Sequence, residues 1–242
     1  MISVCMATYN GERFIKQQID SILPQLGEED ELIISDDGST DRTLEIIASY
    51  EDRRIKVLKH KSYMGDFYKN SKLPVVSFNF ENALKEAKGD YIFLSDQDDI
   101  WQHEKVKKSL IALKKFNCVL SNFSIIDDFG NCLKEKFYFK NPIKRSFFAN
   151  LLFPHFIGCC LCFDKTVLKK ILPFPKSTLS HDFWIGLISK KFGKVGFIDE
   201  SLIFHRIGNF NTSTACRKSK NSILMKVKYR FYSFYEILRR ER

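Results

Sequence analysis

The chain has 242 residues, of which 44% are hydrophobic and 28% are charged. This composition excludes an intrinsically disordered chain, and the 11 Gly and 6 Pro residues exclude a collagen-like or low-complexity one. The formal net charge of +10 indicates an anionic partner, such as a phosphate-bearing substrate, a membrane surface or a nucleic acid.

The basic excess is concentrated at the C-terminal end of the chain. Residues 216–242 contain nine Lys and Arg residues against two Glu residues, which leaves residues 1–215 close to balanced. The tail is therefore the basic element, and the body must be interpreted from its own motifs.

The cysteines and the N-terminal segment both favour a cytoplasmic protein. The seven Cys residues include no Cys-x-x-Cys pair and no His spacing suited to a zinc site, so we expect reduced thiols. The N-terminus lacks the basic region of a signal peptide and is typical of a strand. The longest apolar stretch, residues 147–163, is interrupted by Asn150, Pro154 and His155, and we interpret it as core.

Apolar runs alternate with helical patterns along the chain, which predicts βαβ units and a mostly parallel sheet. Ser39, Thr40 and Asp41 are suitable capping residues for one of the helices. Strands are expected over residues 2–7, 32–35, 54–60, 91–96 and 118–122 and near 158–163, and helices over 12–23, 41–50, 79–87 and 102–115.

Polar and acidic residues follow three of the predicted strands. These groups are residues 8–11, 36–41 and 96–99. Open α/β sheets bind ligands at the carboxyl ends of their strands, so the three groups are expected at one site. Two carboxylates one residue apart, as in Asp96 and Asp98, can both reach a hard cation. The alternative is that such residues only form turns and caps, which we favour for Ser39 and Asp41.

Several ordered motifs resemble those of the family 2 glycosyltransferases. The segments are ATYNGERFIKQQIDSILPQ, IISDDGSTDRT and GDYIFLSDQDDIW, followed by FIGCCLCFDKTVLKKILPFP and SHDFWIGLISKKFGKVGFIDESLIFHRIGN. The likeness covers about residues 2–210, and SDQDDIW is most similar to the bacterial branch that includes rhamnosyltransferase-like enzymes.

The resemblance implies a GT-A fold, that is, a Rossmann-like, mostly parallel central sheet flanked by helices. It divides residues 1–215 into a nucleotide-sugar-binding half, about 1–100, and an acceptor half, about 101–215. Residues 216–242 then form a basic amphipathic tail.

The same resemblance gives the first half of the chain its donor-binding roles. Ala7, Thr8 and Tyr9 would contact the base and ribose, and Asp37 would accept a hydrogen bond from the base imide. Asp96 would lie near the ribose and the metal. Asp98 would be the principal ligand of Mn²⁺ or Mg²⁺, which offsets the charge of the departing nucleoside diphosphate.

Asp182 matches the position of the catalytic base in this resemblance. It would take the proton from an acceptor hydroxyl as that oxygen attacks the anomeric carbon, with inversion of configuration. His181 and Trp184 would line the acceptor pocket. For Trp184, a plain core aromatic is the alternative.

The sequence departs from the family pattern near residue 207. The family has a His directly before a Gly-Asn pair, and this chain has Ile207 there. His205 is a candidate third metal ligand, and its alternative is an ordinary hydrogen-bonded side chain. Cys159, Cys160 and Cys162 are interpreted as small buried residues rather than nucleophiles.

The C-terminal tail contains an apolar stripe at helical spacing. The stripe is Ile223, Val227, Phe231, Phe234 and Leu238, with Lys226, Arg230, Ser233 and Arg240 on the other side. This pattern fits an interfacial helix on anionic lipid, or a helix packed on the body or on a partner subunit.

The prediction is a metal-dependent inverting glycosyltransferase that uses a UDP- or dTDP-sugar and acts on a hydroxyl of a bacterial surface glycan, either free or lipid-linked. We expect it in the cytoplasm, with the membrane's inner face as a candidate location. A catalytically inactive nucleotide-sugar-binding protein is the main alternative. A nucleic-acid-binding module is disfavoured by the balanced body, and a dinucleotide oxidoreductase by the lack of GxGxxG after the first strand.

Overall fold

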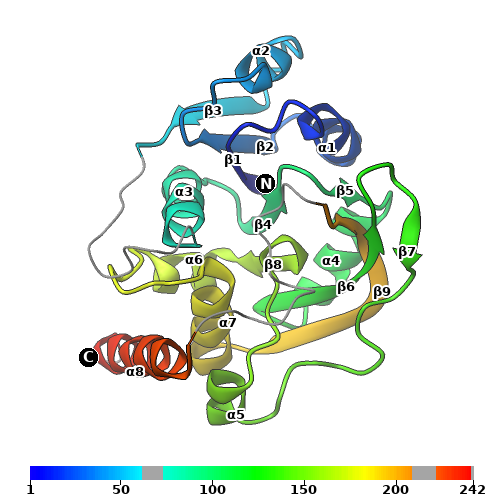
Figure 1. Ribbon diagram of the computed structural model, residues 1–242. Coiled ribbons are helices and arrows are strands. Elements are labelled where there is room, and N and C mark those ends of the chain that lie inside the picture. Colours follow the sequence, from blue (N-terminus) through cyan, green and yellow to red (C-terminus); the bar gives the residue numbers. More distant parts are fainter. Residues whose placement is uncertain (62–72, 209–221, 241–242) are drawn as a thin grey trace.

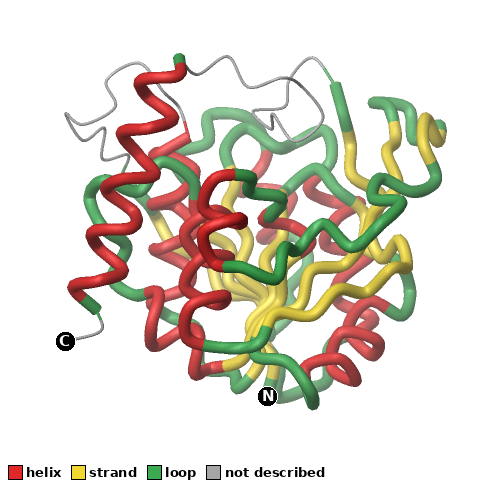
Figure 2. Tube along the Cα trace, turned by 90° about the horizontal axis from the view of Figure 1, so that it is seen from below, coloured by secondary structure: helices red, strands yellow, loops and turns green. Residues whose placement is uncertain are grey.

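The computed structural model describes residues 1–61, 73–208 and 222–240. Its described residues form one sheet of nine strands with helices on both faces (Figures 1 and 2). The strands are β1 (Ile2–Thr8), β2 (Glu31–Asp36), β3 (Ile55–Lys59), β4 (Tyr91–Asp96), β5 (Ile100–Trp101), β6 (Cys118–Ile126), β7 (Cys132–Lys134), β8 (Leu161–Asp164) and β9 (Val195–Arg206).

The helices of the described chain form two layers, one on each face of the sheet, and α8 lies outside them. Helices α1 and α2 contact each other, and α4 contacts the 3-10 turn after α1, whereas α3 and α6 both pack against α7. The helices are α1 (Ile15–Ile22), α2 (Thr43–Ala48), α3 (Leu73–Lys85), α4 (Lys105–Leu113), α5 (Phe147–Leu152), α6 (Lys165–Ile171), α7 (His181–Phe192) and α8 (Ile223–Arg239), and the 3-10 turns are η1 (Leu23–Gln25) and η3 (Gly158–Cys160).

The strand order is β3-β2-β1-β4-β8-β6-β9-β5, with β7 paired to β6. Strands β1 to β4 pair in parallel, as do β6 and β9, and β8 runs antiparallel between β4 and β6. The predicted α/β architecture with its mostly parallel central sheet is confirmed. The antiparallel β8 joins the two halves into one sheet.

The apolar pattern explains why these segments form strands and helices. Strands β2 and β4 are buried over most of their length, so their central residues are continuous apolar runs rather than alternating ones. In α1, by contrast, only Ile15, Ile19 and Ile22 on one face, together with Gln18, are buried.

The predicted boundaries are correct for some elements and wrong for others. The strand over 91–96 matches β4 in full. Helix α3 begins at Leu73 instead of residue 79, and β6 continues to Ile126 instead of ending at 122. The segment near 158–163 begins as the turn η3 and becomes the strand β8 only at Leu161. The predicted boundary between body and tail, at 215/216, lies outside the described residues.

The parallel pairing brings the carboxyl ends of β1, β2 and β4 to one edge of the sheet. Ala7 pairs with Asp96, and Thr8 pairs with Asp36. The residues that follow these strands therefore meet at this edge, as the sequence predicts.

Helix α8 lies on the outside of the molecule, against α5 and α7 (Figures 1 and 2). Ser233 and Ile237 of α8 are buried, and the ring of Tyr229 packs edge-on against Phe183 of α7. Among the described helices, none combines the length and apolar character that a membrane span requires.

Candidate active site

The loops after β1 and β4 are held together by one side chain, that of Gln97. The Thr8 hydroxyl and the Tyr9 backbone N–H donate to Gln97 Oε1 at 2.5 Å and 2.9 Å, and Gln97 Nε2 donates to the Tyr9 carbonyl at 3.1 Å. Gly11 is required beside them because a Cβ there would lie 2.5 Å from Gln97 Oε1. Thr8 is buried, Ala7 is half-buried and the Tyr9 side chain is exposed. Tyr9 is thus free to lie against a ligand.

The two aspartates after β2 have different surroundings. The Asp36 carboxylate accepts hydrogen bonds from the backbone N–H groups of Gly38 and Ser39, so it stabilises the turn. Asp37 points toward the end of β3, where its Oδ1 lies 2.8 Å from His60 Nδ1. Both side chains of this hydrogen-bonded pair are only 10% exposed. His60 therefore fixes the carboxylate that the sequence predicts to bind the base.

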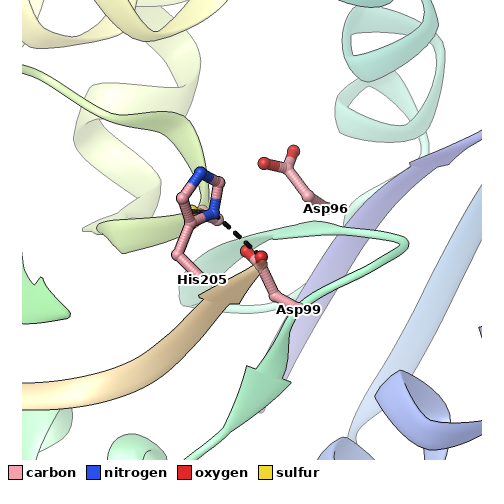
Figure 3. A group of neighbouring side chains, drawn as sticks. Asp96, Asp99 and His205 are labelled. Carbon is pink, nitrogen blue, oxygen red and sulfur yellow. Dashed lines mark hydrogen bonds and ion pairs between the residues drawn. The ribbon is translucent and has the colours of Figure 1, made fainter. Parts of the chain in front are cut away.

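The acids after β4 converge with residues from the second half of the chain. Ligand atoms of Asp96, Asp99, Cys159 and His205 all lie within 4.8 Å of one another. Figure 3 shows the Asp96, Asp99 and His205 side chains pointing toward one another. His205 Nδ1 lies 2.9 Å from Asp99 Oδ1, which also accepts the backbone N–H of Arg206 at 3.1 Å. We call these four residues the buried acid cluster.

The two acids of the predicted metal-binding pair, Asp96 and Asp98, have different surroundings. Asp99, and not Asp98, lies in the buried acid cluster with Asp96 and His205. The Asp98 side chain is half-buried, and its backbone carbonyl accepts a hydrogen bond from Arg206 Nε at 2.9 Å. The chain turns between residues 96 and 99, so the second acid inside the cluster is three residues after Asp96 rather than two.

Burial and mutual repulsion shift the pKa values of these acids. Burial, followed by the charges of Asp99 and Asp98, raises the pKa of Asp96 to about 8. Burial and the charge of Asp99 likewise raise the pKa of Asp98 to about 7. Burial alone would lower the pKa of His205, but the Asp99 carboxylate more than offsets it and raises the value to about 10. His205 and Asp99 thus form a buried ion pair.

The residues of this region fit a divalent cation. Asp99 Oδ2 is buried and has no hydrogen-bond partner among the described residues. Three carboxylates crowd within one turn, and their repulsion would be relieved by a positive charge. Carboxylate oxygens and an imidazole are suitable ligands for Mn²⁺ or Mg²⁺.

Arg206 holds the acidic turn in place. Its guanidinium donates to the carbonyls of Asp98 and Asp127 at 2.9 Å each and to Gln17 Oε1 at 2.7 Å, and it lies 4.3 Å from the ring centroid of Phe14. The side chain is 1% exposed. It therefore joins α1, the turn after β4 and the end of β6.

Asp182 lies in the first turn of α7. Its Oδ1 accepts the Phe183 backbone N–H at 2.7 Å and the Ser180 hydroxyl. The side chain is half-buried, and its negative charge contributes to the raised pKa of Asp96. The predicted base and the predicted donor site thus belong to one electrostatic environment.

The two residues predicted for the acceptor pocket are both buried. His181 stacks on Phe80 with ring centroids 4.2 Å apart and faces Gly158, where a Cβ would lie 2.3 Å from His181 Nε2. That Nε2 has no hydrogen-bond partner among the described residues. Burial lowers the pKa of His181, so its ring is neutral at pH 7.

Trp184 requires a correction. Its indole is 1% exposed, and its Nε1 donates to the Ile171 carbonyl at 3.0 Å. The ring is thus enclosed between α6, α7 and the guanidinium of Arg240, which lies 4.9 Å from its centroid. A ring so enclosed cannot stack on a sugar. Trp184 is therefore a core aromatic residue, as the alternative interpretation has it, and not part of the acceptor pocket.

Sequence reasoning missed four residues that shape this site. They are His60, Asp99, Cys159 and Arg206. Only Asp99 carried a usable signal, because it stands in the same acidic run as Asp96 and Asp98. The other three are brought in by β3, η3 and β9, whose positions depend on the sheet order.

Solved structures with this fold are known. The chain aligns with the structure of Staphylococcus aureus TarS 1–349 in complex with UDP-GlcNAc at a TM-score of 0.67 and 17% identity, covering 99% of this chain and 72% of that one. It aligns with a mannosyltransferase of Pyrobaculum calidifontis, in complex with GDP-Man and Mn²⁺, at a TM-score of 0.59 and 16% identity, covering 98% and 64%. The chain has the GT-A fold of glycosyltransferases.

The sequence relatives agree with this class. The profile described as glycosyl transferase family 2 matches residues 3–172. An uncharacterised glycosyltransferase of Methanocaldococcus jannaschii is 30% identical over 98% of this chain and 78% of its own length. The chain belongs to glycosyl transferase family 2.

Two named bacterial relatives share this similarity. A dTDP-rhamnosyl transferase of Shigella flexneri is 37% identical, over 48% of this chain and 40% of its own length. A putative teichuronic acid biosynthesis glycosyltransferase of Bacillus subtilis is 27% identical, over 88% of this chain and 82% of its own. The chain thus spans less than half of the Shigella protein and most of the Bacillus one.

Proposed function

We propose that the protein transfers a sugar from a nucleoside diphosphate sugar to a hydroxyl group of a bacterial surface glycan, with inversion at the anomeric carbon. The observation that carries this proposal is the position of Asp182, whose charge acts on Asp96 at the carboxyl edge of the sheet. The candidate base therefore lies within electrostatic range of the candidate donor site, which is compatible with a direct displacement.

The proposed donor is a UDP- or dTDP-sugar. Uracil and thymine both carry an imide N–H, and the Asp37 carboxylate, oriented by His60, can accept a hydrogen bond from it. The Shigella relative is named for a dTDP-sugar, and the TarS structure contains UDP-GlcNAc. Tyr9, Thr8 and Ala7 lie next to this position at the end of β1.

Asp96 and Asp98, with His205 as a third candidate, would hold a Mn²⁺ or Mg²⁺ ion, whose charge offsets that of the departing nucleoside diphosphate. The Pyrobaculum structure contains Mn²⁺, which supports this assignment. On the acceptor side, Asp182 would take the proton from the attacking hydroxyl. His181 is buried and faces Gly158, so it would support the wall of the acceptor pocket from behind rather than contact the sugar.

Calorimetric binding of UDP, dTDP, GDP and CDP, with and without Mn²⁺, tests the donor assignment. We expect one pyrimidine diphosphate to bind with metal dependence, and Asp98→Ala to weaken that binding at least tenfold. Asp199→Ala is the matched control, because Asp199 is an exposed aspartate that pairs with Lys136 on the surface. If none of the four binds, the proposed donor class is wrong.

We further propose that α8 docks the protein on an anionic membrane surface, at the inner face of the cytoplasmic membrane. The face of α8 opposite to Ser233 and Ile237 is uncovered. Its large apolar side chains are between 42% and 81% exposed: Ile223, Leu224, Val227, Phe231, Tyr235 and Leu238.

Neighbouring residues extend and charge this surface. Three side chains in and just after α5 are also more than half exposed: Phe148, Leu152 and Phe153. The ring centroids of Phe148 and of Phe234 in α8 lie 5.8 Å apart. Residues 223–240 contain five Lys and Arg residues against one Glu. An apolar face bordered by positive charge complements anionic lipid rather than water or an uncharged partner.

Co-sedimentation with lipid vesicles tests the docking surface. We expect binding to vesicles that contain about one third phosphatidylglycerol, weaker binding to pure phosphatidylcholine, and loss of binding in Val227→Ser/Phe231→Ser. The control is Phe129→Ser/Leu133→Ser, which removes exposed apolar side chains from the β6–β7 hairpin. Equal binding by the two double variants contradicts the proposal. Dimerisation through α8, detected by sedimentation velocity, would assign the surface to a second copy of the chain instead.

A further inference from the structure

The buried acid cluster contains a thiol, which a site built for Mg²⁺ or Mn²⁺ does not need. Cys159 Sγ lies 3.8 Å from His205 Nδ1 and within 4.8 Å of a carboxylate oxygen of Asp96 and of Asp99. Cys159 and Asp99 are fully buried, and His205 is 1% exposed. The donor set therefore consists of one sulfur, one nitrogen and two oxygens.

This combination matches the preferences of a thiophilic ion. Mg²⁺ and Ca²⁺ take oxygen ligands, whereas Zn²⁺ takes Cys, His and carboxylate ligands in a tetrahedral arrangement. A tetrahedral zinc site has four donors, and the cluster offers four residues with one donor each.

A second observation points to a ligand at this place. Asp99 is fully buried, and its Oδ2 has no hydrogen-bond partner among the described residues. A buried carboxylate oxygen left in that state is costly unless something binds it. A cation among the four donors supplies that partner.

The position of the thiol is fixed by its own backbone. Cys159 lies in η3, and its carbonyl accepts a hydrogen bond from Lys105 Nζ at 3.3 Å. Lys105 is 1% exposed, and its ammonium also lies 4.9 Å from the Trp101 ring centroid. A buried lysine so held keeps η3, and with it Sγ, against the acids.

We propose that Asp96, Asp99, Cys159 and His205 form a binding site for a thiophilic divalent cation of the Zn²⁺ type. Binding deprotonates the Cys159 thiol and the His205 imidazolium, and both protons pass to solvent. The cation then takes the place of the proton shared by His205 and Asp99.

The site would also regulate the transferase. Asp96 and the candidate ligand His205 belong both to this donor set and to the proposed hard-cation site, so one cation excludes the other from these side chains. Zinc is therefore expected to act as an inhibitor that competes with Mn²⁺ or Mg²⁺. This consequence rests on the proposed function, whereas binding of the cation itself does not.

Cobalt titration without nucleotide tests the binding directly. The protein is used with Cys132 and Cys216 replaced by Ser, because Cys132 is exposed and Cys216 lies outside the described residues. We expect one equivalent of Co²⁺ to give a thiolate-to-cobalt charge-transfer band and the intense visible bands of a four-coordinate ion. One equivalent of Zn²⁺ should remove them.

Cys159→Ser should lose the charge-transfer band and bind zinc about 100-fold more weakly. Loss of a residue that only hydrogen-bonds to a metal ligand already lowers metal affinity by about 10- to 100-fold, and Cys159 is itself a proposed ligand. Cys162→Ser is the matched control, because Cys162 is a buried thiol outside the cluster that donates to the Val119 carbonyl. X-ray absorption of the zinc form should show one sulfur at about 2.3 Å and lighter ligands at about 2.0–2.1 Å.

The proposal is overturned if the parent protein gives no charge-transfer band, or if Cys159→Ser retains it. Circular dichroism of both variants separates ligand loss from misfolding. A negative cobalt experiment does not change the interpretation of the nucleotide-binding calorimetry, because no thiophilic metal is present in that experiment. Failure of the donor titration with a positive cobalt spectrum would refute the proposed donor class and not the cation site.

Discussion

The carbonyl oxygen of Asp98 accepts a hydrogen bond from Nε of Arg206, 2.9 Å away and 108 residues later in the chain. Through this bond, the last residue of β9 fixes the turn that carries the acids of the candidate site. The Arg206 guanidinium also donates to the Asp127 carbonyl and to Gln17, so a single side chain joins three segments.

Arg206→Lys is expected to lower the free energy of unfolding by about 2–4 kcal/mol, because a lysine cannot satisfy all three acceptors in a buried site. Urea denaturation measures this loss. Arg42→Lys is the control, since Arg42 forms an exposed pair with Glu45 and its substitution should leave the midpoint unchanged. Equal midpoints for the two variants would show that the Arg206 network adds no stability.

Asp182→Asn is expected to lower turnover by about 10²- to 10⁴-fold, as removal of a general base does, and to leave nucleotide binding intact. Single-turnover transfer assays and calorimetry of the same preparation report the two quantities. Asp199→Asn provides the comparison. A protein that binds nucleotide but shows no turnover in either form would support the inactive binding protein instead.

His60→Ala is expected to weaken pyrimidine diphosphate binding about tenfold, because Asp37 loses the partner that orients its carboxylate. The fold should be unaffected by the change. His103→Ala removes an exposed histidine from the other side of the molecule and should bind nucleotide like the parent. Unchanged affinity in His60→Ala would mean that the base does not contact Asp37.

Low pH is expected to lower the free energy of unfolding, in part because Asp52 becomes protonated. The hydrogen bonds from Arg54 lower the pKa of Asp52 to about 2, whereas an unfolded aspartate titrates near about 3.9. The unfolded chain therefore takes up a proton first as the pH falls, so the stability from this pair is complete above about pH 4 and is lost toward pH 2.

The comparison with Arg54→Gln isolates this contribution. The difference in unfolding free energy between parent and variant should shrink as the pH is lowered from 6 to 3, measured by urea denaturation at each pH. A constant difference would mean that Arg54 acts only through its hydrogen bonds to the carbonyls of Leu23 and Leu26.

Local patterns predicted the parts of the fold that depend on local sequence. The run at 91–96 is apolar and ends in acids, and it forms β4 with those boundaries. The start of α3 was missed because Leu73 and Pro74 stand in a segment whose composition is typical of a loop. Strand β9 was not predicted, and its pairing with β6, whose register shifts at Asn122, is not encoded in any local pattern.

The same limit applies to the candidate site. Asp37, Asp96 and Asp182 could be named from motifs, since each stands in a recognisable segment. The position of Asp99 beside Asp96 and His205 depends on how the turn after β4 bends, and that bend is stabilised by Arg206 from a distant strand. Cys159 has no motif of its own, and only the packing of η3 against the acids gives it neighbours.

The pairing of β8 has a consequence for how the molecule can come apart. Cys162 of β8 is aligned with Phe93 of β4 on one side and Val119 of β6 on the other. The same row continues through Val4 to Leu32 and through Val119 to Gly196. Separating the chain near residue 100 would leave unpaired strand edges on both fragments, which favours aggregation over independent folding. The segments before and after residue 100 are therefore expected to unfold together as one cooperative unit.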